Sequence, residues 1–167
     1  MKRTILIVSL AFGSTAMLTA CANHQNQPDL KTQFVPGLGE IMAQSAARHS
    51  KLWFAGQAKN WDLAAYEIDE LREGFADAGK YHPSHKDIRQ PIPDLITTYM
   101  NRPLALLEQA IKDKNPKAFT ENYDKLTNAC NTCHQSTEFG FNVVTRPRLN
   151  PFSNQAFELN EKDRTSN

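Results

Sequence analysis

Near the end of the 167-residue chain, the segment from Cys130 to His134 combines residue types that can do chemistry. Two residues separate the thiols of Cys130 and Cys133, and the imidazole of His134 follows directly. Thiol pairs at this spacing occur in redox dithiols, in zinc sites and at attachment points for haem c. These three kinds of site differ in what else they require from the chain.

Two of the three alternatives lack the features that they require. A structural zinc site needs four ligands, and the sequence has no second CxxC pair. A thioredoxin-like dithiol opens a helix beside a βαβ pattern, whereas this motif closes a helical segment with no strand pattern nearby. Covalent haem c needs two thiols for thioether bonds and a histidine for the iron. We therefore expect one haem c, bound covalently by Cys130 and Cys133, with His134 as the proximal iron ligand.

The third cysteine, Cys21, ends a segment that is typical of a secretion signal. Lys2 and Arg3 precede an apolar run that is rich in small residues and too short for a comfortable membrane-spanning helix. Leu18 to Cys21 resembles the bacterial lipobox, in which the cysteine is lipidated and becomes the first residue of the mature chain. We expect residues 1–20 to be a lipoprotein signal peptide, with an N-terminal anchor helix as the alternative.

Lipidation of Cys21 would hold the mature chain on a membrane, followed by a polar, flexible tether over residues 21–36. Ala22 in place of Asp after the cysteine favours, by analogy with other lipoproteins, the outer over the inner membrane, facing the periplasm. Loss of Lys2 and Arg3 lowers the basic residues from 19 to 17 against 18 acidic ones, a net charge of about −1. This balance indicates no nucleic-acid partner.

Between the tether and the motif, apolar residues recur at spacings of three and four, which predicts helices. The expected segments are 38–58, a second helix capped by Asn60 and reaching about residue 78, 93–114, and 116–134. Pro103 is expected to kink or split the third helix, whereas Asn115 followed by Pro116 should open the fourth. Short connections between them predict an all-α fold, an antiparallel four-helix bundle over residues 37–135.

The helical registers predict which of the candidate side chains face the core. Cys130 and Cys133 continue the apolar stripe of the last helix, so we expect the haem inside the bundle. The acidic face of the second helix, which includes Glu67, is expected to be solvated. His82 and His85 are expected to be exposed histidines of a loop rather than ligands.

Residues 136–167 contain glycine, prolines and several phenylalanines without helical period. We expect them to form an irregular C-terminal extension that packs its aromatic side chains over the bundle or the haem edge.

A helical bundle with CxxCH near the end of its last helix resembles cytochrome c′ and related class II c-type cytochromes. The stretches PGLGEIM, RHSKLWFAGQAKNW and RPRLNPFSNQAF are similar to a set of bacterial exported or lipoprotein haem c proteins with no settled activity. With the bundle pattern, the resemblance covers about residues 36–158. It implies that the first helix faces the distal side of the haem and that the protein can form a homodimer. The lipobox and the residues after 135 depart from the class II pattern.

The sixth ligand of the iron would decide the function. Met42 and His49 are two turns apart on one face of the first helix, and Ser45 and Ala46 between them are small enough for a flat macrocycle to approach. Each candidate also has a structural explanation, core packing for the methionine and a hydrogen-bonded core position for the histidine. Met100 is a third candidate.

A strong sixth ligand would make the protein a carrier of single electrons between periplasmic or membrane redox partners, which is the function we expect. An open distal side would instead allow reversible binding or sensing of a diatomic gas such as NO or CO. Arg48 beside His49 could mimic the distal pair of a haem peroxidase, but consecutive helical residues point about 100° apart. We therefore do not expect an enzyme.

Overall fold

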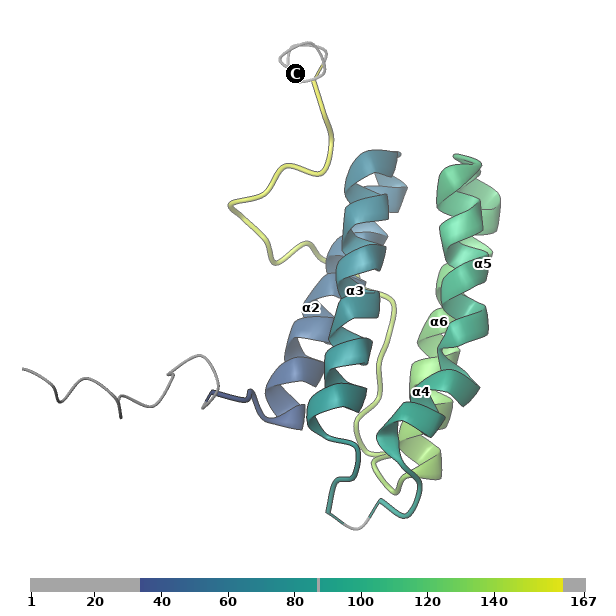
Figure 1. The fold of residues 1–167 in the computed structure, drawn as a ribbon. Helices are drawn as coiled ribbons and strands as arrows, with labels where there is room; N and C mark the ends of the chain where they lie inside the picture. The colour runs from purple at the N-terminus through teal and green to yellow at the C-terminus, as the bar shows by residue number, and fades with distance from the viewer. Residues whose placement is uncertain (1–33, 87, 161–167) are drawn as a thin grey trace, which may run out of the picture. The chain divides into compact units, whose positions relative to one another are not determined.

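The computed structural model describes residues 34–86 and 88–160 (Figure 1), and within them the regular secondary structure is all helix, with no β-strand. The expected signal peptide, the lipidation of Cys21 and most of the tether lie outside the described residues. The helices are α2 (Leu38–Gln57), α3 (Trp61–Tyr81), α4 (Ile92–Tyr99), α5 (Asn101–Lys112) and α6 (Pro116–Ser136). In the described part of the chain, no helix combines the length and apolarity needed to cross a bilayer.

The third expected helix is split at Met100, which separates α4 from α5. The break precedes Pro103, which therefore falls in the first turn of α5, where its missing N–H leaves no helical hydrogen bond unmade. Helical bonding resumes at once, because the Leu104 N–H donates to the Met100 carbonyl at 3.0 Å. The expected split is confirmed, and its position follows from the chemistry of proline.

The turns before α3 and before α6 are built in the same way. Lys59 and Lys114 adopt positive φ angles of 55° and 51°, which end the preceding helices in the left-handed conformation. The next residues, Asn60 and Asn115, accept hydrogen bonds from the N–H groups of Leu63 and Ala118 at 3.2 and 3.1 Å. Both predicted asparagine caps are thus confirmed, and each fixes where a helix starts.

The core consists of a large apolar cluster contributed by α2, α3, α5, α6, Met100 and Phe157, and a smaller one made by Ile41, Ala78, Ile92 and Leu95. Within the large cluster α2 comes very close to α6. A Cβ at Gly56 would lie 2.0 Å from a ring carbon of Phe119, so no larger residue fits there without displacing that ring.

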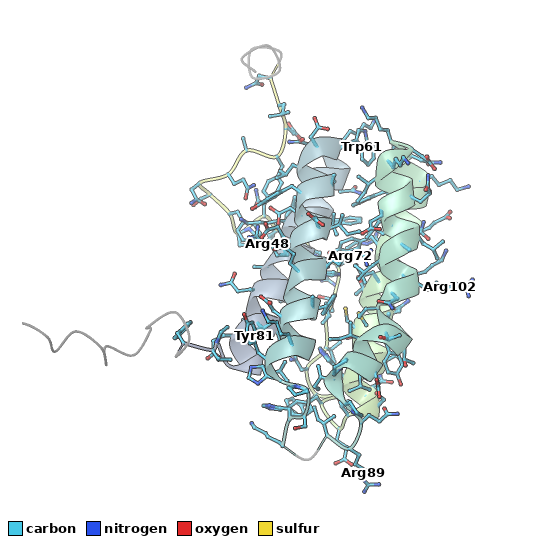
Figure 2. All side chains as sticks on the ribbon, in the orientation of Figure 1. Arg48, Trp61, Arg72, Tyr81, Arg89 and Arg102 are labelled. Atoms are coloured by element: carbon cyan, nitrogen blue, oxygen red, sulfur yellow. The ribbon has the colours of Figure 1, made fainter. Side chains whose placement is uncertain are left out.

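Glu67 is not solvated, contrary to expectation, because it is 1% exposed. It lies at the edge of the inward face of α3, where Arg48 of α2 reaches it at 3.2 Å and also contacts Glu70 at 2.7 Å. A buried carboxylate requires such a partner. Figure 2 shows Arg48 together with Arg72, which pairs with Glu108 and so joins α3 to α5.

One end of the bundle gathers the start of α2, the end of α3, all of α4 and the end of α6 (Figure 1). Trp61 and Tyr81 mark the opposite ends of α3 in Figure 2, and Arg89 lies in the loop beyond Tyr81. The cysteine motif is therefore at the α4 end of the bundle.

Residues 137–160 form neither helix nor strand and run back along the helices from the α4 end (Figure 1). We refer to them as the tail. Phe157 is buried in the large cluster with its ring 5.5 Å from that of Phe54, and Phe152 is partly buried beside it. Phe141 is 81% exposed, so the expected packing on the bundle does not hold for this residue.

Candidate functional site

The last turns of α6 carry Cys130, Cys133 and His134. Upstream on the same stripe, Phe119 and Tyr123 are fully buried. The two cysteines continue that stripe, are partly buried and pack against the large cluster. Both are free thiols, one helical turn apart and on the same side of the helix.

The environment of the thiols is apolar rather than activating. Burial, reinforced by the neighbouring Cys133, raises the pKa of Cys130 to about 12, and burial also raises the pKa of Cys133. A redox-active dithiol needs the opposite, a lowered thiol pKa in an electropositive setting at the start of a helix. These two cysteines therefore lack the activation of a thioredoxin-like pair.

His134 is oriented by the tail. Its Nδ1 lies 2.6 Å from the backbone carbonyl oxygen of Asn142. A carbonyl oxygen can only accept, so Nδ1 carries the proton and the neutral ring keeps its lone pair on Nε2. In the described part of the chain only Nδ1 of this ring is hydrogen bonded. This is the arrangement that orients a metal-binding histidine.

Cys133 lies where the two apolar clusters meet. Met42 of α2, Ile96 and Tyr99 of α4, and Cys133 each pack against both clusters, and all four are only partly buried. The junction is apolar and incompletely covered by protein. Such surroundings suit the flat, apolar body of a macrocycle that is attached beside it.

His49 has a different environment from His134, since it is 5% exposed and stacks on the Tyr123 ring at 4.5 Å. Its Nε2 lies 2.9 Å from the Thr127 hydroxyl, and its Nδ1 lies 3.0 Å from the Tyr123 hydroxyl. Both ring nitrogens are therefore occupied by α6. Burial lowers the pKa of His49 to about 4, which keeps the ring neutral at physiological pH.

The His49 network has two equivalent proton arrangements. With the proton on Nδ1, the ring donates to Tyr123, Tyr123 donates to the His49 carbonyl, and Thr127 donates to Nε2. With the proton on Nε2, the ring donates to Thr127, Thr127 donates to the Tyr123 carbonyl, and Tyr123 donates to Nδ1. Each neutral tautomer makes three bonds, so the network is satisfied without a metal.

The remaining candidates occupy structural positions. Met100 is buried in the large cluster, and Ala46 is exposed, so it does not line the inward face of α2 as expected. His82 and His85 are partly buried rather than exposed. The Nε2 of His82 lies 2.8 Å from the Pro36 carbonyl.

Arg48 is directed to the two carboxylates of α3 and not to the His49 ring. The pair does not reproduce the distal arrangement of a peroxidase.

The residues at the motif fit a covalently attached haem. Two free thiols lie on one side of α6, the neighbouring histidine offers Nε2, and partly buried apolar side chains adjoin them. Within residues 34–86 and 88–160, no three side chains of His, Cys, Asp or Glu gather into a metal-binding cluster. Haem needs only one such protein ligand on its proximal side.

Sequence reasoning did not find the partners of the two histidines. The partners of His49, Thr127 and Tyr123, could have been suspected from the sequence. Tyr123 lies on the apolar stripe of α6, four residues before Thr127, and a buried tyrosine needs a hydrogen-bond partner. The Asn142 carbonyl carried none, because a backbone acceptor in an irregular segment has no residue signature. Comparison of the chain with family models, curated proteins and solved structures finds no match.

Proposed function

We propose that this protein is a monohaem c-type cytochrome with an antiparallel, cytochrome c′-like bundle, lipid-anchored through Cys21 and facing the periplasm. We further propose that it transfers single electrons between periplasmic or membrane redox partners. One observation carries the proposal: two free thiols one turn apart, directly followed by a histidine whose Nδ1 donates to a carbonyl.

Each residue has a distinct role in this proposal. Cys130 and Cys133 would hold the group through thioethers, and His134 would present Nε2 to the iron with its ring fixed by the Asn142 carbonyl. The group supplies a one-electron redox couple when bound. The apolar side chains of α2 and α4 at the cluster junction would exclude water from it.

The position of Met42 supports the electron-transfer hypothesis. Met42 of α2 packs against the same two clusters as Cys133. Ligation of the iron by a methionine together with a histidine would favour the reduced state. We therefore place Met42 ahead of His49 as the candidate sixth ligand.

The His49 network supports the second candidate, binding or sensing of a diatomic gas. Both nitrogens of His49 are engaged by α6, so that ring could bind iron only by giving up hydrogen bonds. With Met42 also unligated, the distal side would be apolar and open, as gas binding requires.

An optical experiment separates the two candidates. The reduced holoprotein and its Met42→Leu variant are mixed with CO, with Met100→Leu as a matched control because Met100 is buried in the large cluster, whereas Met42 is only partly buried. Electron transfer predicts that wild type and Met100→Leu do not respond and that Met42→Leu does. A wild-type spectrum that shifts with CO would overturn the electron carrier in favour of the gas-binding protein.

Covalent attachment of the haem to the two cysteines is tested separately. Replacing Cys130 and Cys133 by Ala should abolish haem staining on a denaturing gel, whereas Thr132→Ala, an exposed change inside the motif, should retain it. Staining that survives loss of both thiols would refute covalent attachment. For the anchor, Cys21→Ser should move the protein from the membrane to the soluble fraction.

A further inference from the structure

Three hydrogen bonds join Asn131 and His134 of α6 to Val144 and Asn142 of the tail, beside the motif. The Asn131 side chain donates from Nδ2 to the Val144 carbonyl at 2.9 Å, and its Oδ1 accepts from the Val144 N–H at 2.8 Å. Two residues earlier, the Asn142 carbonyl accepts from His134 at 2.6 Å. One amide side chain thus pairs with both backbone groups of a single tail residue.

The side chains on either side of Asn142 are not buried against the helices. Phe141 and Val143, which flank Asn142, are 81% and 65% exposed. Apolar packing therefore contributes little to the position of the Asn142 carbonyl. The other anchors of this part of the tail are the Asn142 N–H, which donates to the Phe139 carbonyl at 2.9 Å, the Phe139 N–H, which donates to the His134 carbonyl at 2.8 Å, and Arg146, which pairs with Asp124. The two Asn131 bonds lie between those anchors and next to the acceptor of the His134 proton.

We propose that Asn131, inside the motif, is a positioning residue that sets the electronic character of the proximal ligand by fixing the Asn142 carbonyl against His134. The inference rests on the proposed function, because it concerns a histidine that binds haem iron. A short bond from Nδ1–H to a carbonyl makes the imidazole a stronger donor at Nε2, which stabilises the oxidised metal. Loosening the tail weakens that bond and raises the reduction potential.

The test uses the full mature holoprotein and its Asn131→Ala variant. Asn128→Ala is the matched control, because Asn128 is an exposed asparagine on the same helix, one turn before Asn131. Two quantities are measured for each protein: amide hydrogen exchange in residues 141–146, and the reduction potential by spectroelectrochemistry. We expect Asn131→Ala to exchange about five- to tenfold faster in that segment, in line with lost neutral hydrogen bonds, and to show a higher potential. Asn128→Ala should match wild type in both.

Each other outcome overturns the inference in a recognisable way. Faster exchange with an unchanged potential would make Asn131 only a structural anchor. Unchanged exchange would mean that the two bonds to Val144 do not hold the tail. Wild-type protein without covalent haem would overturn the proposed function together with the inference, whereas a failure confined to Asn131→Ala leaves the proposed function intact.

Discussion

His134 and His49 both contact α6 or its extension, yet their hydrogen bonding leaves them with different capacities. His134 has one bond, to a carbonyl that can only accept, and so its tautomer is set. His49 has hydroxyl partners on both nitrogens, which donate or accept as required, and so either tautomer is satisfied. The difference therefore lies in the partners: Nε2 of His134 has none within the described residues, whereas both ring nitrogens of His49 are engaged. Four tests can break or sharpen this contrast.

The largest expected effect is on His134. Replacing it by Ala removes the only proximal ligand that the proposal offers, so we expect complete loss of the wild-type haem spectrum. His82→Ala is the control, since His82 also has a single bond from its ring to a carbonyl, and it should leave the spectrum unchanged. Added imidazole should restore part of the spectrum to haem-loaded His134→Ala. A wild-type spectrum in that variant would refute the role of His134.

His49→Ala should lower the stability of the protein and leave the haem spectrum unchanged. Removing a buried ring leaves a cavity and strips Thr127 and Tyr123 of their partner, so we expect the free energy of unfolding to fall by about 3 kcal/mol. Urea unfolding at neutral pH measures this loss, with His82→Ala as the control that should lose under about 1 kcal/mol. The haem spectrum should persist. Its disappearance would make His49 a ligand and end the contrast.

The pH dependence of stability tests the same ring without removing it. Burial lowers the folded pKa of His49 to about 4 from 6.5, so between these values the unfolded state binds more protons. Stability contributed by His49 is therefore fully present above pH 6.5 and is lost as the pH falls towards 4. We expect unfolding at pH 5 to need about 2 kcal/mol less than at pH 8 from this group.

His49→Gln, which cannot titrate, should remove that part of the slope. An identical slope in His49→Gln and wild type would show that the ring is not held neutral by burial.

The smallest expected effect comes from a single hydroxyl. Tyr123→Phe keeps the ring stacked on His49 but removes the group that contacts Nδ1 and the His49 carbonyl. We expect a loss of about 1 kcal/mol in the free energy of unfolding. Tyr99→Phe, a partly buried tyrosine outside this network, should change stability by less. Equal effects of the two substitutions would show that the network adds no stability.

The helices were predictable from sequence because their signals are local. Asn60 and Asn115 mark helix starts, and Pro103 forces a break at a position set by its missing N–H. The burial of Glu67 was not predictable, because it depends on Arg48 arriving from another helix. The same holds for the tail, where Phe157 is buried and Phe141 is exposed although the residue type is identical.

The candidate site also has parts that could be predicted from local sequence and parts that could not. The thiols and His134 follow from residue spacing, which is fixed along one helix. The separation of His134 from His49 depends on partners that come from distant parts of the chain: a tail carbonyl in one case and side chains of α6 meeting α2 in the other.

The path of the tail also bears on the order of folding. The Asn60 amide donates to the Phe157 carbonyl across 97 residues, whereas the bonds that build each helix join near neighbours. Closing so long a loop is entropically unfavourable until the elements that it joins are already in place. We therefore expect the individual helices to form first and the tail to dock last. Until the tail docks, Asn131 and His134 lie on a helix whose bonds to Val144 and Asn142 have not formed, so we expect the orientation of the His134 ring to be among the last features of the fold to be set.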